Sequence, residues 1–186
     1  MYSKKAIIAI TILLILLISI IPAGAETAEE WVKKGKALYD QKKYDEAIKC
    51  YDKSLELVPK DSNVWSLKGI ALDKLGKYEE AIKCYDKSLE LGTKDNHVWA
   101  IKGNALDKLG KYEEAIKCYD KSLELGYKNP RFILCLKGIA LGNLCKYEEA
   151  IKCYDKALVE LGSEILAAPV WAIKGSALNE IGRAHV

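Results

Sequence analysis

The chain has 186 residues, of which 30 % are charged and 50 % hydrophobic, enough apolar material for the core of one soluble domain. Its formal net charge is +3, and two of the positive charges, Lys4 and Lys5, lie in the N-terminal segment, so the rest carries +1 (3 − 2). Nucleic-acid binding needs a basic surface that this balance does not provide. We therefore predict no nucleic-acid partner.

Residues 1–25 have the pattern of a targeting segment. A basic start, an apolar run over 6–21 and the small residues Ala23-Gly24-Ala25 are typical of a secretory signal peptide. A helix over that run would span about 24 Å, less than the hydrocarbon core of about 30 Å. Cleavage near Glu26 is therefore favoured over the alternative, an uncleaved membrane anchor. Both alternatives predict an extracytoplasmic protein, secreted or anchored to the outer face of the membrane, and only an uncleaved segment would contact the membrane.

The remainder of the chain repeats itself with a period near 34 residues. The stretch KYEEAIKCYDKSLELG occupies 77–92 and again 111–126, with near copies at 43–58 and 146–162. One glycine marks each unit: Gly35, Gly69, Gly103, Gly138 and Gly175. In the first four units the glycine is followed by a tyrosine at +9, an alanine at +12 and a tyrosine at +16. Such a period is typical of helix pairs that stack to cover each other's apolar flanks.

The second unit illustrates the expected helices. Trp65 and Leu72 give the first helix an apolar stripe, and Gly76 ends it because the turn needs a positive φ. The second helix runs from about Tyr78 to Leu91, with an alanine at the closest helix crossing and a tyrosine beside it. In the fourth unit Cys145 replaces the turn glycine, so we expect a strained turn there.

The pattern W-x-x-x-G followed by Y-x-x-A-x-x-x-Y resembles the tetratricopeptide repeat family. The resemblance implies an all-α fold, a right-handed superhelical solenoid of antiparallel helix pairs over 26–179, whose first helices line a concave groove. It divides the chain into full repeats at 28–61, 62–95, 96–129 and 131–164 and the first helix of a fifth at 168–179. Residues 180–186, EIGRAHV, read like a translated sequencing adapter. We expect them to be a non-native tail and the natural protein to be longer.

The cysteines and acidic residues do not form a recognisable reactive site. Four cysteines occupy one equivalent repeat position, and corresponding helices about 10 Å apart exceed the Cα separation of about 7 Å that a disulfide tolerates. We expect these four to be small packing residues, with an irregular pair involving Cys135 or Cys145 as the alternative. The sequence has no CxxC and only two histidines, and its acidic residues recur as helix-surface pairs such as Glu79 and Lys83. No metal, cofactor or catalytic residue is predicted, and the protein is not expected to be an enzyme.

The resemblance also places certain residues of the first helices on the groove. These positions differ between units whose second helices are near copies, which fits a groove tuned to a ligand or, alternatively, drift on an unused face. The predicted peptide-binding residues are Lys36, Tyr39, Asp40, Ser66, Ile70, Asp73, Lys74, Asn104, Asp107, Lys108, Ile139 and Asn143. Co-chaperones of the family clamp a terminal carboxylate, but here only Lys36 and Asn104 could serve in such a clamp.

The sequence therefore predicts an exported protein–protein interaction scaffold that binds a partner's peptide segment in the concave groove. The alternative is a regulatory or substrate-docking arm of a larger, C-terminally truncated enzyme or membrane protein. A catalytic motif downstream of Asn179 in the native protein would favour the alternative.

Overall fold

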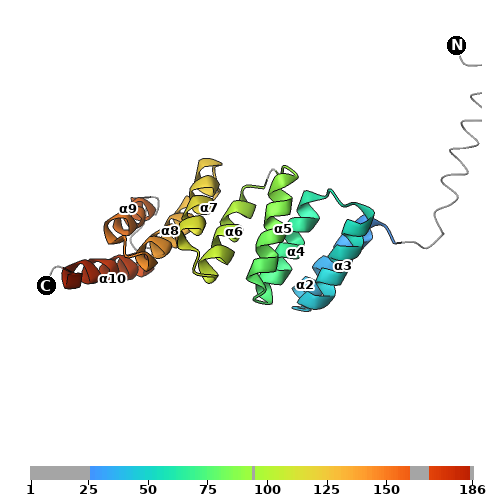
Figure 1. Cartoon of the computed structure of the whole chain (residues 1–186), viewed down its shortest axis with the longest axis horizontal. Helices are drawn as coiled ribbons and strands as arrows, with labels where there is room; N and C mark the ends of the chain where they lie inside the picture. The colour runs from blue at the N-terminus through green and yellow to red at the C-terminus, as the bar shows by residue number, and fades with distance from the viewer. Residues whose placement is uncertain (1–25, 94, 160–167, 185–186) are drawn as a thin grey trace, which may run out of the picture.

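The computed structural model describes residues 26–93, 95–159 and 168–184. The regular secondary structure within these ranges consists of α-helices, with no β-strand. The helices stand in a row of antiparallel pairs, from α2 and α3 at the blue end to α8 and α9, with the single helix α10 following at the red end (Figure 1). The predicted targeting segment, 1–25, lies outside the described residues. Within the described ranges, no helix is long and apolar enough to cross a membrane.

The helix pairs follow the predicted repeats. The first four repeats are α2 (Ala28–Asp40) with α3 (Tyr44–Leu57), α4 (Ser62–Lys74) with α5 (Tyr78–Glu90), α6 (His97–Lys108) with α7 (Tyr112–Glu124), and α8 (Pro130–Asn143) with α9 (Tyr147–Val159). The fifth first helix, α10, spans Ala168–Ala184 and so continues five residues beyond the predicted end at Asn179 (184 − 179). In this extension Arg183 pairs with Glu180 at 2.9 Å, one turn earlier on the helix surface.

The turns within the repeats need a left-handed residue at one fixed position. Gly76 and Gly110 fill it with φ of 74° and 73°, as the sequence predicts. In the first and fourth repeats the position is held by Lys42 and Cys145, with φ of 60° and 59°. A residue other than glycine in this left-handed φ/ψ region lowers stability by about 1–2 kcal/mol. The strain expected at Cys145 is therefore confirmed, and Lys42 shares it.

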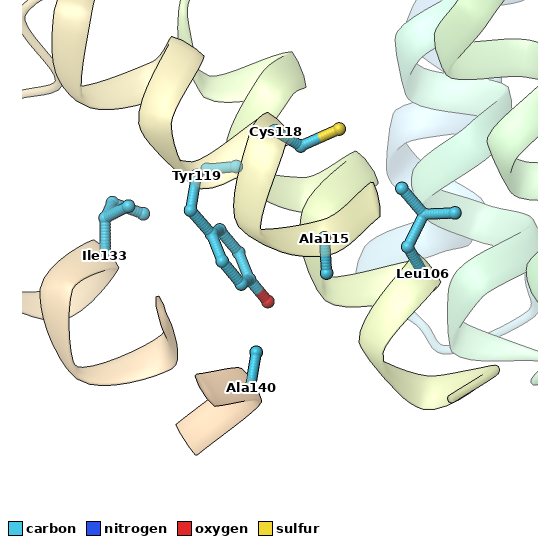
Figure 2. Close-up of a cluster of buried hydrophobic side chains, with 7 residues drawn as sticks. Leu106, Ala115, Cys118, Tyr119, Ile133 and Ala140 are labelled. Carbon is cyan, nitrogen blue, oxygen red and sulfur yellow. The ribbon is translucent and has the colours of Figure 1, made fainter. Parts of the chain in front are cut away.

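Each repeat is held together by a tyrosine ring seated on a glycine. A Cβ added to Gly103 would lie 2.6 Å from Cε1 of Tyr119, and the other three full repeats give 2.3–2.5 Å for the matching pairs. The Tyr119 ring continues toward Ile133 and Ala140 on the next first helix (Figure 2). The ring therefore joins three helices, and only a glycine leaves it room.

Ion pairs connect each second helix to the first helix of the following repeat. Lys68 binds Asp52 at 2.6 Å and Lys102 binds Asp86 at 2.5 Å; the same pair recurs as Lys137 with Asp120 and Lys174 with Asp155. The lysine side chains in these pairs are 17–21 % exposed and their aspartate partners 43–51 % exposed, so each pair is partly open to solvent screening. The pairs link each repeat to the next through the first helices, which carry the candidate site.

The four equivalent cysteines are buried packing residues, as predicted: Cys50, Cys84, Cys118 and Cys153. Cys135 is half-buried and Cys145 is exposed, and all six thiols are free, so the alternative of an irregular disulfide is not realised in this structure. Burial raises the pKa of Cys84 and of Cys118 to about 11. These thiols are therefore neutral and poorly nucleophilic at ordinary pH.

Candidate functional site

The first helices line a series of pockets on one face of the solenoid. The central pocket has a volume of about 350 Å³ and draws its walls from all four full repeats: Tyr39, Ile70, Asp73, Lys74, Tyr85, His97, Ala100, Ile101, Asn104, Phe132 and Leu136. A second pocket of about 370 Å³ is lined by Lys36, Tyr39, Asp40, Tyr51, Leu67 and Ile70. A third of about 270 Å³ is lined by Ile139, Gly142, Asn143, Tyr147, Tyr154, Ser176, Ala177 and Glu180.

The first two pockets adjoin along the groove, because Tyr39 and Ile70 line both. The wall of the central pocket is apolar where Ile101, Leu136 and Phe132 meet. Phe132 is the only phenylalanine in the chain, and it is 52 % exposed. A large exposed aromatic side chain beside a pocket is typical of a site that anchors a partner.

The floor of the groove combines acidic and basic groups. Burial raises the pKa of Asp73, and the positive charges of Lys74 and Lys108 oppose that rise. The pKa of Asp107, which lies outside the three pocket linings, is raised by burial in the same way, with Lys108 again opposing. Since the Asp73 carboxylate is partly desolvated and lines the central pocket, it gains from a ligand that donates a hydrogen bond. The groove can therefore hold an apolar side chain and a hydrogen-bond donor close together.

Two ring pairs involve residues that line the groove. Tyr39 packs edge-on against Tyr44 with ring centroids 5.2 Å apart, and burial raises the pKa of the Tyr39 hydroxyl. The His97 ring stacks on Tyr127 at 5.6 Å, and its Nδ1 lies 3.0 Å from the Tyr127 hydroxyl. Both pairs hold a pocket-lining ring in place, so part of the groove is formed before any ligand arrives.

The structure brings most of the predicted residues into these pockets. Those that line at least one of the three are Lys36, Tyr39, Asp40, Ile70, Asp73, Lys74, Asn104, Ile139 and Asn143. Ser66 does not: it is 8 % exposed, so its side chain is packed between helices rather than presented to a ligand. Asp107 is half-buried and Lys108 exposed, and neither belongs to the three linings. Lys36 and Asn104 lie in different pockets and do not converge as a carboxylate clamp would require.

Sequence reasoning missed the apolar wall. Phe132, Ile101, Leu136 and Leu67 line the groove but were not predicted. A signal was present for Phe132, because the equivalent positions of the other full repeats hold only polar residues, namely Glu29, Asn63 and His97. This departure from the repeat could have singled out Phe132.

Three family models of the tetratricopeptide repeat match residues 26–94, 98–125 and 133–158. The chain belongs to the tetratricopeptide repeat family. Among solved structures it is similar to YrrB, described as a tetratricopeptide repeat protein with an unusual peptide-binding site, with 20 % identity and a TM-score of 0.74 over 89 % of this chain and 83 % of that one. A structure of MamA gives 22 % identity and a TM-score of 0.69 over 75 % and 81 % of the two chains.

MamA from Desulfovibrio magneticus RS-1 gives 20 % identity and a TM-score of 0.70 over 87 % of this chain and 94 % of that one. At these identities the likenesses show the shared fold alone. No curated protein matches the sequence. The fold and the family are thereby established.

Proposed function

We propose that this protein is an exported scaffold that binds an extended segment of a partner protein in the groove of its first helices. The observation that carries the proposal is the adjoining pair of pockets between α2 and α8, with the exposed ring of Phe132 on the wall of the central one. The neighbour YrrB, whose description names a peptide-binding site, supports a peptide as the ligand.

Binding in this proposal depends on a groove whose walls are fixed by the stacking of the repeats. An apolar side chain of the peptide enters between Ile70, Ile101 and Phe132, while a donor on the peptide reaches the carboxylate of Asp73. A groove that is already formed loses little conformational entropy on binding, so more of the contact energy appears as affinity. Lys74 and Lys36 at the rim lie beside the acidic groups and would pair with acidic residues of the ligand.

Export is proposed from the N-terminal sequence, 1–25, with its basic start, apolar run and small residues before Glu26. The test is the intact mass of the protein purified from its native host. We expect a chain that begins at or near Glu26. A chain that retains residues 1–25 and is found in the cytoplasm would contradict export.

Selection from a random peptide library tests the groove. Peptides enriched on the protein should share an apolar residue, and Phe132→Ala should weaken their binding by about tenfold or more, because the aromatic anchor is lost. The matched control is Leu125→Ala: Leu125 is 49 % exposed, against 52 % for Phe132, but it follows the second helix α7 and lies outside the three pockets. If both substitutions had the same effect, or neither had any, peptide binding at this groove would be refuted.

A further inference from the structure

The two adjoining pockets of the groove share an arrangement of acidic and phenolic groups. Tyr39 lines both pockets; in the central one it stands with Asp73 and Tyr85, and in the second with Asp40 and Tyr51. The aspartates come from the first helices α4 and α2, and the two other tyrosines come from the second helices α5 and α3. We call these five residues the acidic junction.

The tyrosines of the second helices reach the junction past the first helices. The ring of Tyr85 lies against Gly69 of α4, where an added Cβ would be 2.5 Å from its Cε1, and Tyr51 lies against Gly35 of α2 at the same distance. Each tyrosine is 1 % exposed, yet each lines a pocket, and neither hydroxyl has a hydrogen-bond partner among the described residues. Since buried hydroxyls ordinarily have a partner, these two indicate a polar ligand group at the junction.

The carboxylates of the junction also have no partner within the described part of the chain. The aspartates between successive repeats each bind a lysine: Asp52, Asp86, Asp120 and Asp155. No ion pair or hydrogen bond of this kind involves the carboxylate of Asp73 or Asp40, although the exposed Lys74 and Lys36 line the same pockets. The half-buried Asp73 therefore gains from a cation that a ligand brings into the central pocket.

The charge of Asp73 acts on both neighbouring phenols. Burial raises the pKa of Tyr85, and the negative charge of Asp73 adds to the rise. Burial also raises the pKa of Tyr39, with further contributions from Tyr44, Asp73 and Asp40. The ligand group that suits this environment carries a positive charge, donates several hydrogen bonds to oxygen atoms and stacks on an aromatic ring. An arginine guanidinium does all three, and it is less strongly hydrated than a lysine ammonium.

We propose that the groove selects partner segments that carry an arginine close to an apolar residue. The guanidinium lies against the carboxylate of Asp73 with the rings of Tyr39 and Tyr85 beside it, while the apolar residue packs against Phe132 in the same pocket. This inference rests on the proposed function, since it names which segments the peptide groove takes.

The test uses a peptide enriched on the protein from the random library and the same peptide with citrulline, a neutral isostere, in place of arginine. In calorimetric titrations the arginine peptide should bind about tenfold more tightly or better. Asp73→Asn should remove this difference. Asp107→Asn is the matched control and should keep most of the difference, because Asp107 is the half-buried equivalent in the next repeat but lies outside the three pocket linings.

Three results would overturn the inference while peptide binding itself stands. One is a set of enriched peptides that Phe132→Ala weakens but that contain no arginine. Another is a citrulline or lysine peptide that binds as tightly as the arginine peptide, and the third is an equal effect of Asp73→Asn and Asp107→Asn. Equal effects of Phe132→Ala and Leu125→Ala would instead refute peptide binding at the groove, and this inference with it. The two failures are therefore read from different variants.

Discussion

The Gly103→Ala substitution should destabilise the protein although alanine is the better helix former. The new Cβ would lie 2.6 Å from Cε1 and 2.8 Å from Cδ1 of Tyr119, which is 0 % exposed. The ring cannot swing aside because Ile133 and Ala140 back it on the next first helix. Overpacking of this kind lowers the free energy of unfolding by about 1–3 kcal/mol, and contacts this short place the cost in the upper half of that range. The gain in helix propensity offsets about 1 kcal/mol. The net expected loss is about 1–2 kcal/mol.

Urea unfolding followed by circular dichroism measures this loss, with Gly142→Ala as the matched control. Gly142 lies inside α8, and a Cβ there would meet no described atom within 4 Å, so its replacement should stabilise by up to about 1 kcal/mol. In a Tyr119→Ala background the Gly103→Ala substitution should become neutral or stabilising, since the clash is gone. If Gly103→Ala stabilised the intact protein, or its effect were unchanged without the Tyr119 ring, the ring-on-glycine account would be refuted.

Three further predictions follow from the turns, the thiols and the groove carboxylate. Cys145→Gly should stabilise by up to about 1 kcal/mol in thermal unfolding, as should Lys42→Gly, because glycine relieves the positive φ; no gain at either position would mean an unstrained turn. A thiol reagent at pH 8 should modify exposed Cys145 first and reach buried Cys84 only on unfolding, and equal rates would contradict the burial. Burial raises the pKa of Asp73, so stability falls as pH rises through that pKa. Asp73→Asn should therefore raise the Tm at pH 7 and have no such effect below a pH of about 4. An equal gain in Tm at both pH values would exclude burial of the ionised carboxylate as the cause.

The sequence was sufficient to predict the helix pairs, because each full repeat has its glycine, alanine and tyrosines at the same spacing. The alanine and the tyrosine expected at the helix crossing of the second repeat, Ala81 and Tyr85, are buried, and Gly76 adopts the predicted positive φ. The contact between a glycine and the tyrosine sixteen residues later could not be predicted. Spacing along the chain places two residues on facing helices, but it does not specify which ring seats on which backbone.

The groove was less predictable than the fold. Equivalent positions in different repeats have different exposures, because the crossing of neighbouring first helices decides which side chains reach the surface. Ser66 is 8 % exposed, whereas Cys135, its counterpart in the fourth repeat, is half-buried. Phe132 and Leu136 extend the central pocket from the following repeat, and such contacts between repeats depend on the stacking geometry rather than on any motif within one repeat.

Methyl chemical shifts recorded during titration with a selected peptide test the proposed function most directly. The methyl groups of Ile70, Ile101 and Leu136 report on the groove, and those of Ile82 and Ile116 on the second helices α5 and α7 provide matched probes outside the three pockets. The proposal predicts saturable shifts at the first three and little change at the other two. Shifts centred on Ile82 and Ile116, with Ile70 and Ile101 unmoved, would place binding elsewhere and contradict the groove as the binding site.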